Sequence, residues 1–277
     1  MILKKLTNYR NEILYPNTIK FIPDNIANRW VKYGIAQITE IDASEPEITI
    51  PDDGGYLKHE KVSIVIPVFN ALEYLKKCIK SLLLKTQNFE LIIIDNGSDA
   101  ITKAYLKRKQ ESIGFILETN ERNMGFSYAC NQGIKLATCD YILLLNSDTM
   151  FSDNWLGKLM MGFKMPDAGI VGASTCFSAG VQCDHSLKNK RMQMSQSDID
   201  RVVTQNGIVE AEVYGFCYLI SRKLVDTIGV FDVDRYPIGS AEEKDYTWRA
   251  YKAGFKSYWV KDSYVHHFGN KTFNEMG

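Results

Sequence analysis

The sequence predicts an α/β fold, in which helices flank a mostly parallel sheet, with a small α+β module at the N-terminus. Two patterns support this prediction. From Lys61 onward, short β-branched runs alternate with segments whose apolar residues recur at helical spacing. Ahead of Lys61, an acidic stretch containing Pro and Gly interrupts the chain. We therefore expect a module at residues 1–40, a linker at residues 41–60 and a large domain at residues 61–277.

The N-terminal module has signals for a short strand, a helix and a second strand. The strands are expected at Ile19–Ile22 and Ile35–Ile41, and the helix begins at Pro23 and is stopped by Gly34. A module of this size is too small to promise independent stability. The stretch from Glu40 to Asp53 then contains six acidic residues and no Lys or Arg, which indicates an extended linker.

The large domain is expected to form repeated β-α units. The run Val62–Ile66 is typical of a strand that is buried on both faces of a parallel sheet. Helices are expected at Leu72–Leu83, at Phe126–Ala137, where the apolar stripe is clearest, and at Asp153–Lys164. The further strands are expected at Leu91–Ile94, Phe115–Leu117, Tyr141–Leu145, Gly169–Ala173 and Ser257–Val260. Right-handed crossovers would make the first of these strands parallel.

Composition excludes several classes of protein. The formal charge is zero and the pI is about 6.9, which argues against a general nucleic-acid binder. The longest aliphatic runs fall far short of the ~20 residues that span a bilayer, and no secretory signal is recognisable. The expected compartment is the cytoplasm, with peripheral association at a membrane left open.

The cysteines do not indicate a metal motif. None of the six forms a CxxC pair, so free thiols in a reducing cytosol are expected. A site built on Cys176, Cys183 and His185 would lack a fourth ligand.

Polar residues follow the expected strands, where open α/β sheets bind their ligands. Each alone usually forms a turn or caps a helix, but four strands that deliver polar groups to one edge indicate a nucleotide site. No GxGxxG or GxxxxGK[ST] motif occurs. We therefore expect a divalent cation, itself bound by carboxylates, to bind the phosphates. The residues are Pro67, Asn70, Asp95, Arg122, Asn123, Asn146 and Asp148.

A series of sequence blocks resembles the family 2 inverting glycosyltransferases of the GT-A fold. In order, they are VSIVIPVFN, IIIDNGSD, NERNMGFSYACNQGI, YILLLNSDTM, YGFCYLISRKLVDTIGVFD, AEEKDYTWRAYKAGF and VHHFG. The resemblance runs from about Val62 to Thr272, about three quarters of the chain. It implies a GT-A domain that moves a sugar from a nucleotide diphospho-sugar, commonly UDP-linked, to an acceptor hydroxyl. The sugar and the acceptor, whether glycan, lipid-linked or protein, are not identified.

The resemblance also implies roles in the nucleotide half. Asp95 is similar to the carboxylate that accepts a hydrogen bond from the base, and Asn123 with Arg122 lies where the family lines the nucleotide pocket. Asp148 is similar to the carboxylate of the DxD motif that binds Mn²⁺ or Mg²⁺. Asn146 replaces the first Asp of that motif, so its amide is expected to serve the ribose or a metal-bound water. The alternative for Asp148 is to cap the helix that follows it.

In the second half, the resemblance implies that Glu243 is the general base, where the family usually has Asp. Three carboxylates at a helix start could otherwise complement the helix dipole. Asp245 and Arg249 are spaced for an i, i+4 ion pair that would support the site. Glu242 is a further candidate for a supporting role. His266 is expected to complete the cation's ligands, with His267 as the alternative, and the polar loop Ser174–Asn206 is either a lid or an ordinary surface loop.

Two other classes of function stay open. A sugar nucleotidyltransferase would also use this type of sheet and a cation, but it normally has a Gly-rich loop bearing Arg or Lys after the first strand, and IPVFNALEYL has none. A degenerate, non-catalytic carbohydrate- or nucleotide-binding module is favoured by the departures at Asn146 and Glu243.

Overall fold

A computed structural model describes residues 58–237 and 241–269, together with short strands nearer the N-terminus. The chain divides into two compact units, residues 1–47 and residues 48–277. The division falls within the stretch expected to be a linker, while the functional boundaries at residues 40 and 60 remain predictions.

The first unit contains two antiparallel pairs of strands. β1 (Ile2–Leu3) pairs with β4 (Ala36–Gln37), and β2 (Thr7–Tyr9) pairs with β3 (Glu12–Leu14). β4 lies inside the strand expected at Ile35–Ile41. The expected strand at Ile19–Ile22 and the helix after it lie outside the described residues.

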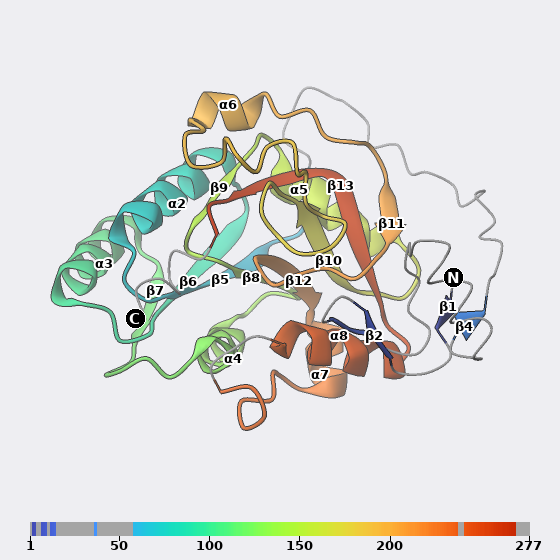
Figure 1. The fold of residues 1–277 in the computed structure, drawn as a ribbon. Coiled ribbons are helices and arrows are strands. Elements are labelled where there is room, and N and C mark those ends of the chain that lie inside the picture. Colours follow the sequence, from blue (N-terminus) through green and yellow to red (C-terminus); the bar gives the residue numbers. More distant parts are fainter. Residues whose placement is uncertain are drawn as a thin grey trace. The chain divides into compact units, whose positions relative to one another are not determined.

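The second unit is built on a nine-stranded mixed sheet (Figure 1). Its main path follows the order β11-β13-β10-β12-β8-β5-β6-β7, and β9 pairs with β13. β8, β5, β6 and β7 are parallel, as expected, whereas β12 runs antiparallel between β8 and β10. The strands are β5 (Val62–Val68), β6 (Phe89–Asp95), β7 (Ile116–Thr119), β8 (Tyr141–Leu145), β9 (Thr149–Phe151), β10 (Ala168–Ser174), β11 (Ile208–Glu210), β12 (Cys217–Ser221) and β13 (Lys256–His267).

Helices cover both faces of this sheet (Figure 1). α2, α3 and α5 pack on one face and α4, α7 and α8 on the other, which makes two separate hydrophobic clusters. Side chains alternate along β5, so that Ile64 and Ile66 enter the first cluster and Val65 enters the second. The helices are α2 (Leu72–Lys85), α3 (Ala100–Ile113), α4 (Phe126–Leu136), α5 (Trp155–Met160), the 3-10 helix η1 (Met161–Lys164), α6 (Gln196–Asp200), α7 (Arg222–Ile228) and α8 (Glu242–Lys252).

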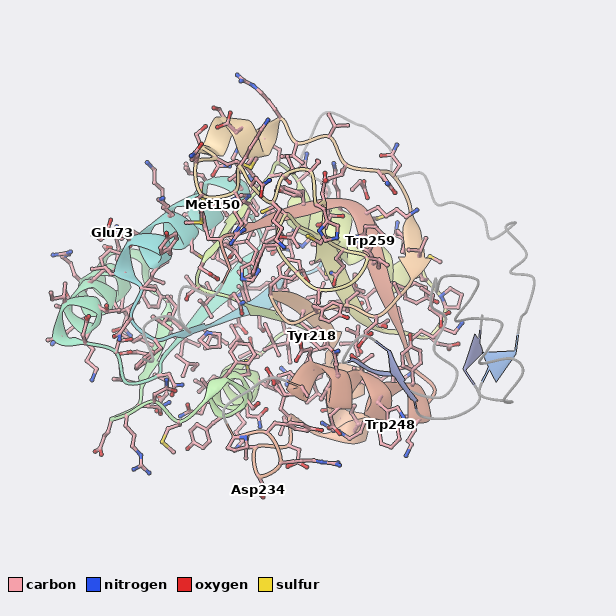
Figure 2. The ribbon with its side chains drawn as sticks, viewed as in Figure 1. Glu73, Met150, Tyr218, Asp234, Trp248 and Trp259 are labelled. Carbon is pink, nitrogen blue, oxygen red and sulfur yellow. The ribbon has the colours of Figure 1, made fainter. Side chains whose placement is uncertain are left out.

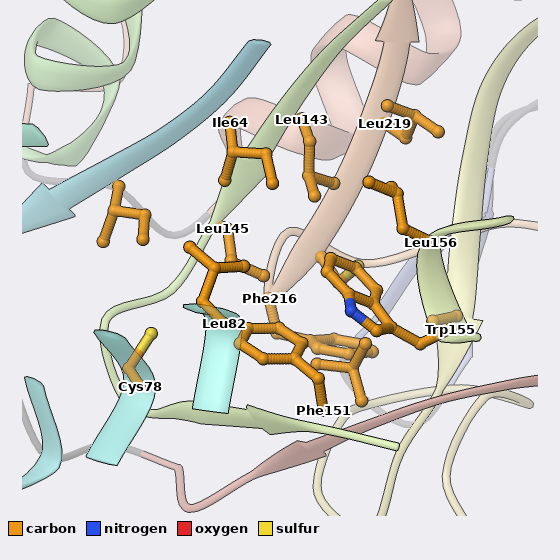
Figure 3. Packing of buried hydrophobic residues seen from close by; sticks show 14 of the residues in the cluster. Ile64, Cys78, Leu82, Leu143, Leu145, Phe151, Trp155, Leu156, Phe216 and Leu219 are labelled. Atoms are coloured by element: carbon orange, nitrogen blue, oxygen red, sulfur yellow. The ribbon is translucent and has the colours of Figure 1, made fainter. Parts of the chain in front are cut away.

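Large side chains fill the first cluster beside α5 (Figure 3). The rings of Phe151 and Trp155 stack with their centroids 4.4 Å apart, and the Trp155 indole N–H donates to the Thr86 hydroxyl over 3.0 Å. In the second cluster, α4 approaches β5 so closely at Gly133 that an added Cβ would overlap the Val65 side chain. Within the described residues, no helix is both long and apolar enough to cross a membrane.

The structure differs from the expected elements at several places, and the expected elements did not include β9, β11, β12, α6 or α7. The helix expected at Asp153–Lys164 is divided into α5 and η1. α3 was not anticipated because few apolar residues mark it; Asp99 caps its start by accepting a hydrogen bond from the Thr102 N–H. The last strand continues well past Val260, because β13 pairs first with β10 and then with β9.

Candidate active site

The loops after β5 and β6 are joined by short hydrogen bonds at the carboxyl edge of the sheet. Asp95 is buried at the end of β6 and accepts a hydrogen bond from the Ser98 N–H over 2.9 Å. The Asn70 side-chain oxygen accepts from the Asp99 N–H over 2.8 Å, and the Asn70 N–H donates to the Ser98 hydroxyl over 3.0 Å. Pro67 is placed beside them, opposite Ile94 in the parallel pairing. The structure therefore brings three of the expected nucleotide residues to one edge.

Asn96, which the sequence analysis overlooked, organises the neighbouring loop. Its amide nitrogen donates to the Asn123 side-chain oxygen (2.9 Å) and to the Gly125 carbonyl (3.1 Å), while its oxygen accepts from the Met124 N–H (3.0 Å). Asn123 is thereby held in position at the same edge. The position of Asn96 directly after a buried strand, within the DNGSD block, was the signal that could have identified it.

Close backbone packing joins these two loops. Gly97 has a φ of +83°, and an added Cβ would lie only 2.6 Å from the Arg122 Cα and 2.7 Å from the Asn123 nitrogen. A residue with a side chain would push Arg122 and Asn123 away from the edge. The Arg122 side chain itself is exposed.

Asn146, Asp148 and His267 meet at the end of β8. The His267 Nε2 atom lies 3.2 Å from the Asp148 Oδ1 atom and 3.2 Å from the Asn146 amide nitrogen. All three come together because β9 pairs with the end of β13, with Thr149 opposite His267. Asp148 is almost fully buried. It does not cap a helix: α5 starts at Trp155 with Asn154 at its N-cap position, so the capping alternative is wrong.

The His267 ring is fixed in an orientation that suits a cation ligand. Its Nδ1 atom lies 2.8 Å from the Phe177 carbonyl, and its ring stacks on Phe216 at 5.4 Å. When the ring is neutral, an Nδ1–H bond to a backbone carbonyl leaves the Nε2 atom, which faces Asp148, able to bind a cation, as in many metal-binding histidines. Burial disfavours the charged imidazole, but attraction to Asp148 outweighs it and the pKa of His267 is raised. A carboxylate and an imidazole in this arrangement fit a divalent cation.

His266 points elsewhere, so the choice of His266 as the cation ligand is not supported by its geometry. Its side chain is 0% exposed, with Nε2 lying 2.9 Å from the Arg191 carbonyl and Nδ1 lying 3.2 Å from the Tyr264 hydroxyl. Protein groups thus occupy both ring nitrogens. Burial lowers the pKa of His266 to about 4, which keeps the imidazole neutral.

Glu243 lies in the first turn of α8, close to the strand end that carries this group. Its carboxyl carbon would lie 3.8 Å from a Cβ placed on Gly215, the residue before Phe216. Phe216 in turn accepts a hydrogen bond from the Asn146 N–H over 3.0 Å and stacks on His267. Burial raises the pKa of Glu243 to about 7, and the nearby charge of Glu242 adds to the rise. A half-buried carboxyl group with that pKa is suited to accept a proton near neutral pH.

The other polar residues of α8 position the helix. The Glu242 carboxylate accepts a hydrogen bond from the Ala241 N–H over 3.0 Å, and the expected ion pair is present, with 2.8 Å between the Arg249 Nε and the Asp245 Oδ2 atoms. Arg249 also donates to the carbonyls of Ile228 and Val230. The Tyr218 hydroxyl of β12 lies 2.6 Å from the Thr247 hydroxyl; Figure 2 shows Tyr218 above this helix.

The cysteine cluster in the loop after β10 does not form a metal centre. Cys183 lies 3.6 Å from the His185 ring, and Cys176 lies 3.3 Å from the His266 ring. Over residues 58–237 and 241–269, no group of three or more His, Cys, Asp or Glu side chains is arranged to hold a metal. The Asp148–His267 pair would therefore need phosphate or water to complete a cation's ligands.

Comparison with known proteins decides the family. The model of glycosyl transferase family 2 matches residues 63–229, which is more than half of the chain. The chain belongs to glycosyl transferase family 2. This family 2 chain is 24% identical to the glycosyltransferase GlyA of Streptococcus pneumoniae over 194 residues, which cover 69% of the chain and 28% of GlyA. It is 32% identical to GlyG of the same organism over 117 residues, or 40% of the chain and 38% of GlyG.

A further relative is the poly-beta-1,6-N-acetyl-D-glucosamine synthase of Staphylococcus aureus, 25% identical over 203 residues, or 71% of the chain and 47% of the synthase. The family 2 chain thus spans 28% to 47% of the length of these relatives.

Solved structures confirm the GT-A fold of the family 2 chain. The mannosyltransferase PcManGT from Pyrobaculum calidifontis, in complex with GDP-Man and Mn²⁺, has a TM-score of 0.59 at 15% identity, covering 87% of this chain and 62% of that one. GalNAc-T7 with UDP, GalNAc and Mn²⁺ also has a TM-score of 0.59, at 16% identity, covering 75% and 43%. The predicted α/β class and the family resemblance are both confirmed.

Proposed function

We propose that this chain is the catalytic domain of a cation-dependent, inverting glycosyltransferase. Its donor in this proposal is a nucleotide diphospho-sugar, with UDP as the nucleotide. The observation that carries the proposal is the Asp148–His267 pair at the carboxyl edge of the sheet, with Glu243 close by on the second half of the domain. Family membership supports glycosyl transfer, and the two solved neighbours are complexes with Mn²⁺ and a nucleotide.

Each part of the edge has a distinct task in this proposal. Asp95, which accepts from the Ser98 N–H, and Asn123, held by Asn96, bind the base and the ribose. The rest of the nucleotide site is lined by Asn70, Pro67, Arg122 and Asn146. Asp148 and His267 would hold the cation, Mn²⁺ or Mg²⁺. Such a cation would offset the negative charge that develops on the leaving diphosphate.

Glu243 removes the proton from the acceptor hydroxyl as that hydroxyl attacks the anomeric carbon. Its raised pKa makes it a better base than an ordinary exposed carboxylate. Because the attack is opposite to the diphosphate and uses no enzyme nucleophile, a single displacement inverts the anomeric configuration. Glu242, Asp245 and Arg249 hold α8 and therefore Glu243 in place.

The direct test is to incubate the full chain with a panel of UDP- and GDP-sugars and Mn²⁺, and to measure the nucleotide released. Slow hydrolysis of one donor, lost when EDTA is added, is the expected result. Binding of a donor without any turnover would favour the non-catalytic module suggested by Asn146 and Glu243. Release that depends on added pyrophosphate would instead indicate a nucleotidyltransferase.

A further inference from the structure

The loop that follows β10 passes close to β13 (Figure 1). Arg191, in this loop, contacts Phe268, the residue that follows β13. The Arg191 Nε atom donates to the Phe268 carbonyl over 3.0 Å, and Nη1 donates to the Lys188 carbonyl over 3.2 Å. Its guanidinium carbon lies 4.3 Å from the centre of the Phe177 ring. These contacts fix the plane of the guanidinium group.

Two of the three described residues that contact the Arg191 side chain, Phe268 and Phe177, also contact the proposed cation pair. The Phe268 N–H donates to the Asp148 carbonyl over 3.0 Å. The Phe177 carbonyl bonds the His267 Nδ1 atom over 2.8 Å, and its ring packs edge-on to the His267 ring at 5.7 Å. Arg191 is thus linked to Asp148 through Phe268, and to His267 through Phe177.

The neighbouring histidine holds the backbone of the same residue. The His266 Nε2 atom lies 2.9 Å from the Arg191 carbonyl, so two successive residues of β13 serve the same site by different routes. His267 faces Asp148, whereas His266 contacts the backbone of the loop that carries the Arg191 guanidinium group. This explains a fully buried histidine next to the site that does not face Asp148.

The charge of Arg191 has no partner of opposite sign within the part of the chain that the structure describes. Its hydrogen bonds go to carbonyl groups, and no described Asp or Glu forms an ion pair with it. A half-buried guanidinium group in this state favours an anion, and its planar fork suits phosphate oxygens. The site also has one carboxylate fewer than a DxD motif, because Asn146 is neutral, so less negative charge is present there to repel a phosphate group.

We infer that Arg191, from the loop between β10 and β11, binds the diphosphate of the nucleotide donor beside the cation. The inference rests on the proposed function, because it assumes a nucleoside diphosphate at this edge. A guanidinium bond to a charged phosphate corresponds to roughly 10- to 100-fold in affinity.

The test is calorimetry on the full chain with UDP, GDP, UMP and GMP, each with Mn²⁺ and again with EDTA. Arg191→Met retains an apolar stem on Phe177 but lacks the charge and the fork, and should weaken binding of the diphosphate by roughly 10- to 100-fold. The monophosphate should bind as it does to the wild type, and the loss should persist in EDTA. Arg191→Lys should be intermediate, since it retains only the charge.

Lys190→Met is the matched control, because it removes the same charge from the exposed neighbouring residue. It should leave diphosphate affinity unchanged, and melting temperatures should show that all variants are folded. Equal diphosphate affinity of Arg191→Met and wild type would overturn the inference. So would an equal loss for monophosphate and diphosphate, which would indicate a purely structural role. A wild type that binds no nucleoside diphosphate would overturn the proposed function as well.

Discussion

The two halves of the GT-A domain assemble their polar groups in different ways. In residues 62–145, the groups at the sheet edge bond to one another over short stretches of chain: Asp95 to Ser98, and Asn96 to Asn123. In residues 146–269, the partners are far apart in sequence; His267 reaches Asn146, 121 positions away. The first half is a series of local β-α units, whereas the second is held together by β13.

In the proposed function, the first half binds the base of the nucleotide, whereas the second half binds the cation and the diphosphate and supplies the general base. The proposed nucleotide residues of the first half follow successive strands, so their placement needs only the parallel sheet. The proposed general base and cation pair require β12 to insert between β8 and β10, and β13 to reach β9. We therefore expect substitutions in the second half to affect turnover or cation-dependent binding, and those at close contacts in the first half to affect stability.

The largest effect is expected at Glu243. Glu243→Gln cannot accept a proton, so kcat should fall by roughly 10²- to 10⁴-fold while donor affinity is retained. Glu243→Asp, the residue more usual in the family, should retain part of the activity despite its shorter reach. Steady-state kinetics on one donor and calorimetry with the nucleotide measure the two effects. Wild-type turnover in Glu243→Gln would remove this residue from the mechanism and leave Glu242 or Asp245 as candidates.

The cation pair gives the next largest effect. Asp148→Ala and His267→Gln should each weaken the Mn²⁺-dependent part of UDP binding by roughly 100-fold, because each removes a proposed ligand. His266→Gln is the matched comparison and should have a smaller effect, since its ring faces Arg191 and Tyr264. Calorimetry with and without EDTA measures this. A greater loss in His266→Gln than in His267→Gln would restore His266 as the ligand.

The pH dependence of turnover should follow the Glu243 carboxyl group. Its pKa is raised to about 7, so the group is protonated and inactive as a base below that pH and ionised above it. The value of kcat should therefore fall on the acid side, approaching tenfold per pH unit below about 7. A rate profile between pH 5.5 and 8.5 would check this, and a flat profile would contradict it.

A smaller effect, on stability alone, is expected in the first half at Gly133. Gly133→Ala places a methyl group against Val65 in a fully packed layer, and should lower the free energy of unfolding by about 1–3 kcal/mol. Urea denaturation measures the change. In a double-mutant cycle with Val65→Ala, the two substitutions should compensate, because the smaller side chain makes room. Strictly additive losses would show that the close approach is not the cause.

Local patterns were enough to predict most of the first half. β8 was expected at its observed bounds, Tyr141–Leu145, because a buried strand between two helical layers has to be apolar on both faces. The long last strand was underestimated, because its polar residues after Val260 gave no sign that it changes partners. Arg191 was also missed, since nothing in a polar loop distinguishes the one arginine that docks on β13.

The sequence by itself determined the fold class, the family and the strand ends at which polar groups gather, because these depend on apolar periodicity and on residues close together in the chain. Only the tertiary structure decided whether His266 or His267 faces Asp148. Neighbouring residues of a strand point to opposite faces, so one of the two can face Asp148 and the other cannot. The pairing of β13 with β9 places Thr149 opposite His267, and this register sets which histidine meets the carboxylate.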